Sequence, residues 1–313
     1  MRKNLKLLLG TAILGVLLVA AIFAWAENQQ KMIPSFIKPL DSNRTSGVIE
    51  QAKAQELAKS IVAKFRPGAE ISEGTLQEKL PGQRKVWSFK FGKQGWLDLD
   101  AETGEPLIYG YVDTEKQLMN AKTHRTTLGK EDLLELAKQE FQKLGVSWPG
   151  GEPEAELITD LGGCPGIAEW RIKWPKLYKG YQFRGDTINA TVDAYTGELL
   201  AYNNYWFSKA PPTLEVKVAK DEAREVAAKV LASSSSEVKD VEIESPGELY
   251  IVNPNYRWRE DREFIKYPPG ETRLAWLFNF TLKRQFPETV YKQVGEIWID
   301  AENKEVLGGV ISP

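Results

Sequence analysis

The sequence holds one cysteine, Cys164, and one histidine, His124, among its 313 residues. A single cysteine excludes an internal disulfide, and the two residues together are too few for a zinc or iron site built from histidine and cysteine. A basic excess is also missing, since 41 basic and 43 acidic side chains give a formal net charge of −2. This balance argues against nucleic acid as a partner, because binding phosphates needs a concentrated basic face.

The longest uncharged run stands at the N-terminus. Residues 1–6 are basic, and no residue from Leu7 to Ala26 carries a charge. A helix of that length rises about 30 Å, which is enough to cross the hydrocarbon core of a membrane. Ala24 and Ala26 also fit a signal-peptidase site, so cleavage after Ala26 is the alternative. We therefore predict a single-pass membrane anchor over residues 1–26, with the rest extracytoplasmic, or secreted if the leader is cleaved.

One pattern occurs three times after the leader. Each copy begins with a stretch of helical periodicity, over 47–65, 128–144 and 219–232, in which apolar residues recur at spacings of three and four. A strand with large apolar residues at alternate positions follows, then a strand that ends in Asp-Ala, then a third strand after a tight turn. The alternating strands carry Trp87, Phe89 and Phe91; Trp170, Ile172 and Trp174; and Trp276, Phe278 and Phe280. Such alternation buries one face of a sheet, and the apolar stripe of the helix is the obvious cover for it.

The sequence thus predicts an α+β protein in which a transmembrane helix precedes three units, each a helix packed on an antiparallel meander. The units span residues 47–112, 128–207 and 214–312. The linkers between them, near 113–127 and 208–218, indicate that each unit has a core of its own. Fully burying a Trp or Phe side chain contributes on the order of 2–3 kcal/mol, so three large residues in a strand can carry a small core.

The turn after each Asp-Ala pair has its own chemistry. The Asp can accept hydrogen bonds from turn amides, and a following Gly supplies the positive φ of a type I turn with a bulge. In the third copy Asn303 and Lys304 replace Thr-Gly, and Asn is the next best residue for a left-handed position. We predict a structural role, not a catalytic one, for six turn residues: Asp100, Gly104, Asp193, Gly197, Asp300 and Asn303.

Several aromatic side chains are candidates for contact with a partner. They belong to an insert and the closing segment of the second copy and to a polar loop of the third. Aromatic residues in loops form contact surfaces for proteins or glycans. The alternative is that they pack between the repeats or cover the open end of a sheet. The candidates are Trp174, Tyr178, Tyr181, Phe183, Tyr205, Tyr256 and Trp258.

The succession of a helix, an aromatic strand and a strand that ends in Asp-Ala-x-Thr-Gly-Glu resembles the PepSY domain family. The stretch from Tyr178 to Ile188, ahead of Asp193, is similar to the related YcdB/YcdC repeat, and the second and third copies carry such an insert. The likeness covers residues 47–312. It implies an exported or membrane-anchored protein without catalytic residues, of a kind proposed to restrain peptidases or wall-lytic enzymes. The absence of disulfides in an exported chain favours a bacterial surface.

The predicted function is a non-catalytic interaction module that binds or restrains another exported protein, of the peptidase or cell-wall enzyme class. No catalytic residue, metal ligand or cofactor is predicted. A cell-wall or glycan-binding module that uses the loop aromatics is the alternative. A hydrolase with a carboxylate pair is the third hypothesis, but among 43 acidic residues the sequence singles out no pair.

Overall fold

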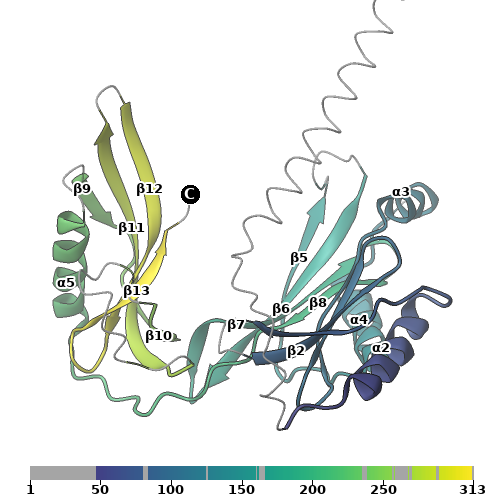
Figure 1. Cartoon of the computed structure of the whole chain (residues 1–313). Coiled ribbons are helices and arrows are strands. Elements are labelled where there is room, and N and C mark those ends of the chain that lie inside the picture. Colours follow the sequence, from purple (N-terminus) through teal and green to yellow (C-terminus); the bar gives the residue numbers. More distant parts are fainter. Residues whose placement is uncertain are drawn as a thin grey trace, which may run out of the picture.

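The computed structural model is an α+β fold in which four helices, among the residues described, lie against a large, mostly antiparallel sheet of 13 strands (Figure 1). It describes residues 47–79, 84–124, 126–159, 161, 166–234, 238–255, 257, 267, 270–286 and 289–311. The predicted anchor over residues 1–26 lies outside these ranges. Within them, no helix has the length and apolarity needed to cross a membrane.

The elements follow the predicted order, with additions. The helices are α2 (Gln51–Phe65), α3 (Thr114–Thr123), α4 (Lys130–Leu144) and α5 (Lys220–Ser233). The strands of the first two copies are β1 (Thr75–Lys79), β2 (Arg84–Phe91), β3 (Gly95–Asp100), β4 (Pro106–Tyr111), β5 (Glu154–Thr159), β6 (Ala168–Tyr178), β7 (Tyr181–Asp193) and β8 (Leu199–Asn204). Those of the third copy are β9 (Val238–Ile243), β10 (Glu248–Val252), β11 (Arg273–Phe286), β12 (Thr289–Asp300) and β13 (Val306–Ile311).

Each copy forms the predicted antiparallel meander, namely β2–β3–β4, β6–β7–β8 and β11–β12–β13. Each meander also has a preceding strand that the repeat pattern did not predict. β1 pairs with β2, β5 pairs with β6, and both β9 and β10 pair with β11. α2, α4 and α5 cover one face of the meanders, and in Figure 1 α5 lies at one end of the molecule and α2 and α4 lie at the other.

A hydrogen-bonded corner ties the helix to the meander in the same way in all three copies. The indole nitrogen of the first strand donates to a carbonyl oxygen two residues before the helix: Trp87 to Ile49 at 3.1 Å, Trp170 to Leu128 at 3.3 Å, and Trp276 to Val218 at 2.9 Å. The amides of the same three acceptor residues donate to the alanines of the Asp-Ala pairs, Ala101, Ala194 and Ala301. The three segments are therefore structurally equivalent, residue by residue, at this corner.

The first two copies share one core, so the prediction of a separate core for each is wrong for this pair. β4 pairs with β8, which joins the two meanders into one sheet, and α2 packs beside α4. Phe65 and Tyr109 of the first copy belong to the same buried apolar cluster as Phe141 and Tyr202 of the second. The predicted linker 113–127 contains α3. The third copy has its own core between α5 and β11–β12.

The junction of β4 and β8 is symmetric. Its register places Tyr109 opposite Tyr202, with Ile108 opposite Asn203 and Gly110 opposite Ala201. Tyr109 and Tyr202 are equivalent residues, each four positions after the Glu that follows the turn. An antiparallel pair in which equivalent residues face each other has local two-fold symmetry. The third strand of this repeat is thus a surface through which two copies join.

Candidate functional site

The predicted turn aspartates hold the turns. The Oδ1 atom of Asp100 accepts from the amides of Glu102 and Thr103 at 2.9 and 2.8 Å. Asp193 and Asp300 accept in the same way from the amides two and three residues later. The second carboxylate oxygen faces Arg84 at 2.5 Å in the first copy and an arginine again in the third, but Asn120 of α3 in the second. A carboxylate engaged on both oxygens is a structural group here.

In the third turn, Lys304 has the positive φ that was predicted for Asn303, and Asn303 serves as a hydrogen-bond acceptor. Gly104 and Gly197 have φ of +78° and +73°, and the equivalent left-handed residue is Lys304, with φ of +67°. Asn303 occupies the position of the threonine, and its Oδ1 accepts from the Glu305 amide at 2.9 Å, as the Thr103 hydroxyl accepts from the Glu105 amide. The expectation that Asn303 supplies the left-handed conformation is therefore wrong, because its side chain is needed as an acceptor.

Two of the predicted contact aromatics are buried, which corrects their assignment. Trp174 is 1% exposed in the core of the first two copies, and Phe183 is 2% exposed where β7 meets the third copy. Tyr178 and Tyr181 are partly buried and pack against the cluster that contains Phe183. Their aromatic surface is used between repeats. Tyr256 and Trp258 lie outside the described residues.

The junction with the third copy is built by the insert of the second. The N-terminal part of β7 pairs in parallel with β10, with Phe183 opposite Ile251. Arg184 makes a two-pronged ion pair with Glu296 of β12, at 2.8 and 2.5 Å, and this carboxylate raises the pKa of Arg184. Beside it, buried Asp186 accepts from the hydroxyl and amide of Ser208 at 2.7 and 2.9 Å. The Arg184–Glu296 pair and the β7–β10 pairing cross to the third copy, and the Ser208 hydroxyl held by Asp186 accepts from the Nδ2 atom of Asn253, after β10, at 2.6 Å.

The sheet face away from α2 and α4 carries the best candidate for a functional surface. One row of directly opposed residues crosses six strands, from β3 to β5, and consists of Trp96, Gly110, Ala201, Thr191, Arg171 and Glu156. A second row beside it consists of Asp98, Ile108, Asn203, Asn189, Lys173 and Glu154. With strands about 4.8 Å apart, each row runs for roughly 24 Å. We call these two rows the open face.

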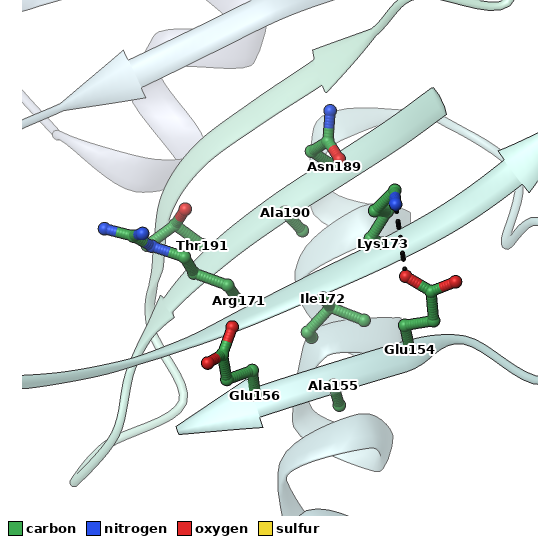
Figure 2. Close-up of a pocket in the computed structure, with 9 residues that line it drawn as sticks. All are labelled: Glu154, Ala155, Glu156, Arg171, Ile172, Lys173, Asn189, Ala190 and Thr191. Carbon is green, nitrogen blue, oxygen red and sulfur yellow. Dashed lines mark hydrogen bonds and ion pairs between the residues drawn. The ribbon is translucent and has the colours of Figure 1, made fainter. Parts of the chain in front are cut away.

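The charged end of the open face lies on β5 and β6 (Figure 2). A shallow hollow of about 330 Å³ opens there, floored by backbone and lined by both rows. Lys173 donates to Glu154 at 3.2 Å, and Arg171 donates to Glu169 at 2.8 Å. The side chains of Arg171 and Glu154 are 55% and 61% exposed, so these ion pairs are open to water and can exchange for pairs with a ligand.

The middle and the other end of the open face differ in character. Thr191, Asn189 and Asn203 offer hydroxyl and amide groups at half-buried positions. Trp96 is 40% exposed, and its indole lies over Gly110, where an added Cβ would come within 2.1 Å of the ring. The aromatic end is partly closed, because Asp98 is only 4% exposed and lines a small hollow with Tyr205 and Phe207. Burial, and then the charge of Asp98, raises the pKa of Tyr205.

The sequence reasoning missed the open face. Its residues are the polar members of the alternating strands, and hydrophobic periodicity marks only the apolar members. The predicted candidate Tyr205 is the one that borders it. Among the residues described, no group of three or more His, Cys, Asp or Glu side chains is arranged to hold a metal ion.

The chain is thus an α+β repeat protein with one sheet face covered by helices and an open face that carries polar and charged groups. No protein-family model matches it, and no curated protein matches it. Among solved structures, it is similar to the Bacillus megaterium YpeB C-terminal domain, with a TM-score of 0.41 and 12% sequence identity, over 85% of this chain and 99% of that one. The similarity is distant.

Proposed function

We propose that this chain is a non-catalytic interaction module that binds another protein through the open face. The observation that carries the proposal is the pair of rows that crosses six strands with charged, amide and aromatic groups in succession. α2 and α4 occupy the opposite face, and the β4 and β8 edges of the two meanders pair with each other. Among the described residues of the first two copies, the open face is therefore a broad surface left for a ligand.

The chemistry of the open face suits a polypeptide. Arg171 and Lys173 alternate with Glu154 and Glu156 across neighbouring strands, so groups of either sign on a partner find a counter-charge. The amides and hydroxyls in the middle can both donate and accept hydrogen bonds. Exposed charges, half-buried polar groups and an exposed aromatic side chain are all common in protein interfaces.

We further propose that the partner is an exported protein of the peptidase or cell-wall enzyme class, and that residues 1–26 anchor the chain in the membrane with the bulk outside. The resemblance to the PepSY family and the uncharged run from Leu7 to Ala26 support these two points. N-terminal sequencing of the native protein tests the anchor. A mature chain that begins at Glu27 would show that the leader is cleaved.

Site-specific photo-cross-linking in cells tests the open face. A photo-reactive phenylalanine at Thr191 of the full-length chain should yield a discrete adduct with another exported protein. The same group at Gln139, an exposed position on α4, is the control and should yield none. Equal adducts from both positions, or none from Thr191, would refute binding at the open face.

Charge reversal tests the same surface without a probe. Arg171→Glu combined with Lys173→Glu should weaken binding of the captured partner about tenfold, equivalent to about 1.4 kcal/mol. Lys138→Glu on the outer side of α4 changes the net charge in the same direction and should leave binding unchanged. Binding unaffected by the double reversal would exclude these two residues from the interface.

A glycan is the second candidate ligand, and the exposed indole of Trp96 favours it. An indole face laid over a glycine offers a flat apolar surface of the kind on which sugar rings stack. Retention of the full-length chain on insoluble peptidoglycan, and its loss on Trp96→Ala but not on Arg171→Glu, would favour the glycan over the protein partner.

A further inference from the structure

The third strand of the third copy ends the sheet. β13 pairs with β12 on one side, and among the described residues no other strand pairs with it. Its counterparts β4 and β8 pair with each other. β13 carries no charged residue, and Val310 is 40% exposed. An uncharged edge strand is a template for pairing with another chain unless something covers its backbone groups.

Within the described part of the chain, the side chain of Asn255 bonds to this edge. The Nδ2 atom of Asn255 donates to the carbonyl of Gly309 at 2.7 Å, and its Oδ1 accepts from the Gly309 amide at 3.1 Å. The backbone amide of Asn255 donates to the carbonyl of Leu307 at 3.0 Å. Asn255 thereby bonds to the strand edge much as a single residue of a neighbouring strand would.

The strand is shaped to receive this amide. Gly308 has φ of +139°, and a Cβ added there would lie 1.9 Å from the Oδ1 of Asn255. At the corresponding positions the first two copies have Ile108 and Ala201, which carry side chains. The glycine at 308 in the third copy therefore goes together with the presence of Asn255.

The position that Asn255 covers is the position at which the first two copies join. Gly309 lies four residues after Glu305, as Tyr109 and Tyr202 lie four residues after their own glutamates, and those tyrosines face each other across the β4–β8 junction. We propose that the β13 edge is a strand-docking surface that the Asn255 amide keeps closed, and that the partner it excludes is β13 of a second copy of this chain.

The internal junction explains why a second copy fits. β4 and β8 show that third strands of this repeat pair antiparallel about a local two-fold axis. Two β13 strands in the same arrangement would place Gly309 opposite Gly309 and Val310 opposite Gly308. Such an interface uses the same surface on both partners, closes after two subunits and leaves no β13 edge free for further growth. Asn255 acts as a plug that keeps the chain monomeric at this edge.

The test is the molar mass of the full-length chain in solution, by light scattering over a concentration series, in one buffer for all variants. Asn255→Ala removes the plug and should give a concentration-dependent doubling of the mass relative to the parent. Asn255→Asp keeps the shape but loses the Nδ2 donor and sets a carboxylate against the Gly309 carbonyl, so it should also release the edge. Asn279→Ala, at an exposed asparagine of β11 in the same copy, is the control and should behave as the parent.

Hydrogen exchange of the 306–311 segment locates the contact. In the plug variants its amides should be protected at high concentration and should exchange faster on dilution. If both plug variants keep the thermal midpoint of the parent to within a few degrees and stay at the parent's mass, the proposal is overturned. Dimers whose 306–311 amides exchange independently of concentration would also overturn it, because the contact would then lie elsewhere.

Discussion

The indole nitrogen of Trp276 donates to the carbonyl oxygen of Val218 at 2.9 Å, two residues before the first residue of α5. The same bond joins Trp87 to Ile49 ahead of α2. One side chain thus fills space between helix and sheet and also fixes where the chain enters the helix. Tryptophan is suited to this position, because phenylalanine would fill the space and leave the carbonyl without its donor.

The first prediction concerns these tryptophans. Trp87 is 8% exposed, and Trp87→Ala should lower the free energy of unfolding by about 3–5 kcal/mol, the range for deleting a large buried aromatic. Trp170→Ala and Trp276→Ala should cost less, since both residues are only partly buried. Trp276→Phe should cost about 1 kcal/mol, the value of the lost hydrogen bond. Urea denaturation measures all four.

Limited proteolysis shows which part of the chain opens in these variants. We expect Trp87→Ala to expose the first and second copies together, since they share one core, and Trp276→Ala to expose the third alone. If all three alanine variants melt within about a degree of the parent, a shift worth well under 1 kcal/mol, the tryptophans contribute nothing to the cores.

The sequence predicted the repeated parts of the fold well, because each rests on a local signal. Helical periodicity located α2, α4 and α5, and period-2 aromatics located β2, β6 and β11. The signal failed where long-range pairing decides the outcome. No local pattern in the sequence around Tyr109 and Tyr202 predicts that β4 and β8 pair and that the two cores join. β1, β5 and β9 lack aromatic alternation, and they are strands because a meander edge was available to them.

The candidate site was harder to predict than the fold. Trp174 and Phe183 appeared to be contact residues because they belong to an insert rich in aromatics. In the structure Trp174 is buried in the core of the first two copies, and Phe183 packs against the third copy. The open face was missed because its members, such as Thr191 and Arg171, are ordinary polar residues one position away from the apolar ones. Only the register of six strands brings them into one row.

The second prediction concerns the turns. Gly104→Val and Gly197→Val should each lower the free energy of unfolding by about 1 kcal/mol or more, because a β-branched residue resists positive φ. The added Cβ would also meet Leu57 at 2.8 Å in the first turn and Leu136 at 2.7 Å in the second. Lys304→Gly relieves the same conformation in the third turn and should be neutral or mildly stabilising. Unchanged thermal midpoints for both valine variants would contradict the turn assignment.

The third prediction is a loss of stability in acid. Burial raises the pKa of Asp100, but the Thr103 amide and the charge of Arg84 lower it by more, so its pKa lies below the ordinary value. The pKa of Glu198 is lowered in the same way. Burial raises it, but the hydrogen bonds and charges of Lys116 and Arg66 lower it by more. A carboxyl with a depressed folded-state pKa stabilises the protein above its unfolded-state pKa, and the contribution is lost as the pH falls through the folded-state value.

The free energy of unfolding from urea titrations between neutral pH and mild acid measures this dependence. Asp100→Asn keeps an oxygen that can accept from the turn amides but cannot ionise, so its stability should fall less steeply with pH than that of the parent. Glu105→Gln, an exposed change beside the same turn, is the control and should keep the slope of the parent. An equal slope in parent and Asp100→Asn would show that Asp100 does not contribute to the acid sensitivity.

The last prediction concerns Phe183, through which the second copy holds the third. Its side chain is 2% exposed and packs with Ile251 and Leu274, and the ammonium of Lys176 lies 4.6 Å from the ring centroid. Phe183→Ala should lower stability by about 3–5 kcal/mol. Because the third copy has a core of its own, it should remain folded while the junction weakens. Calorimetry should then resolve two transitions in place of one, and X-ray scattering should show a larger radius of gyration.

Phe280→Ala is the matched control, since Phe280 is 1% exposed in the core under α5, away from the junction. It should destabilise the third copy without changing the radius of gyration below the transition. A Phe183→Ala variant that melts in one transition with the parent's radius would show that the Arg184–Glu296 pair and the β7–β10 pairing hold the junction without the ring.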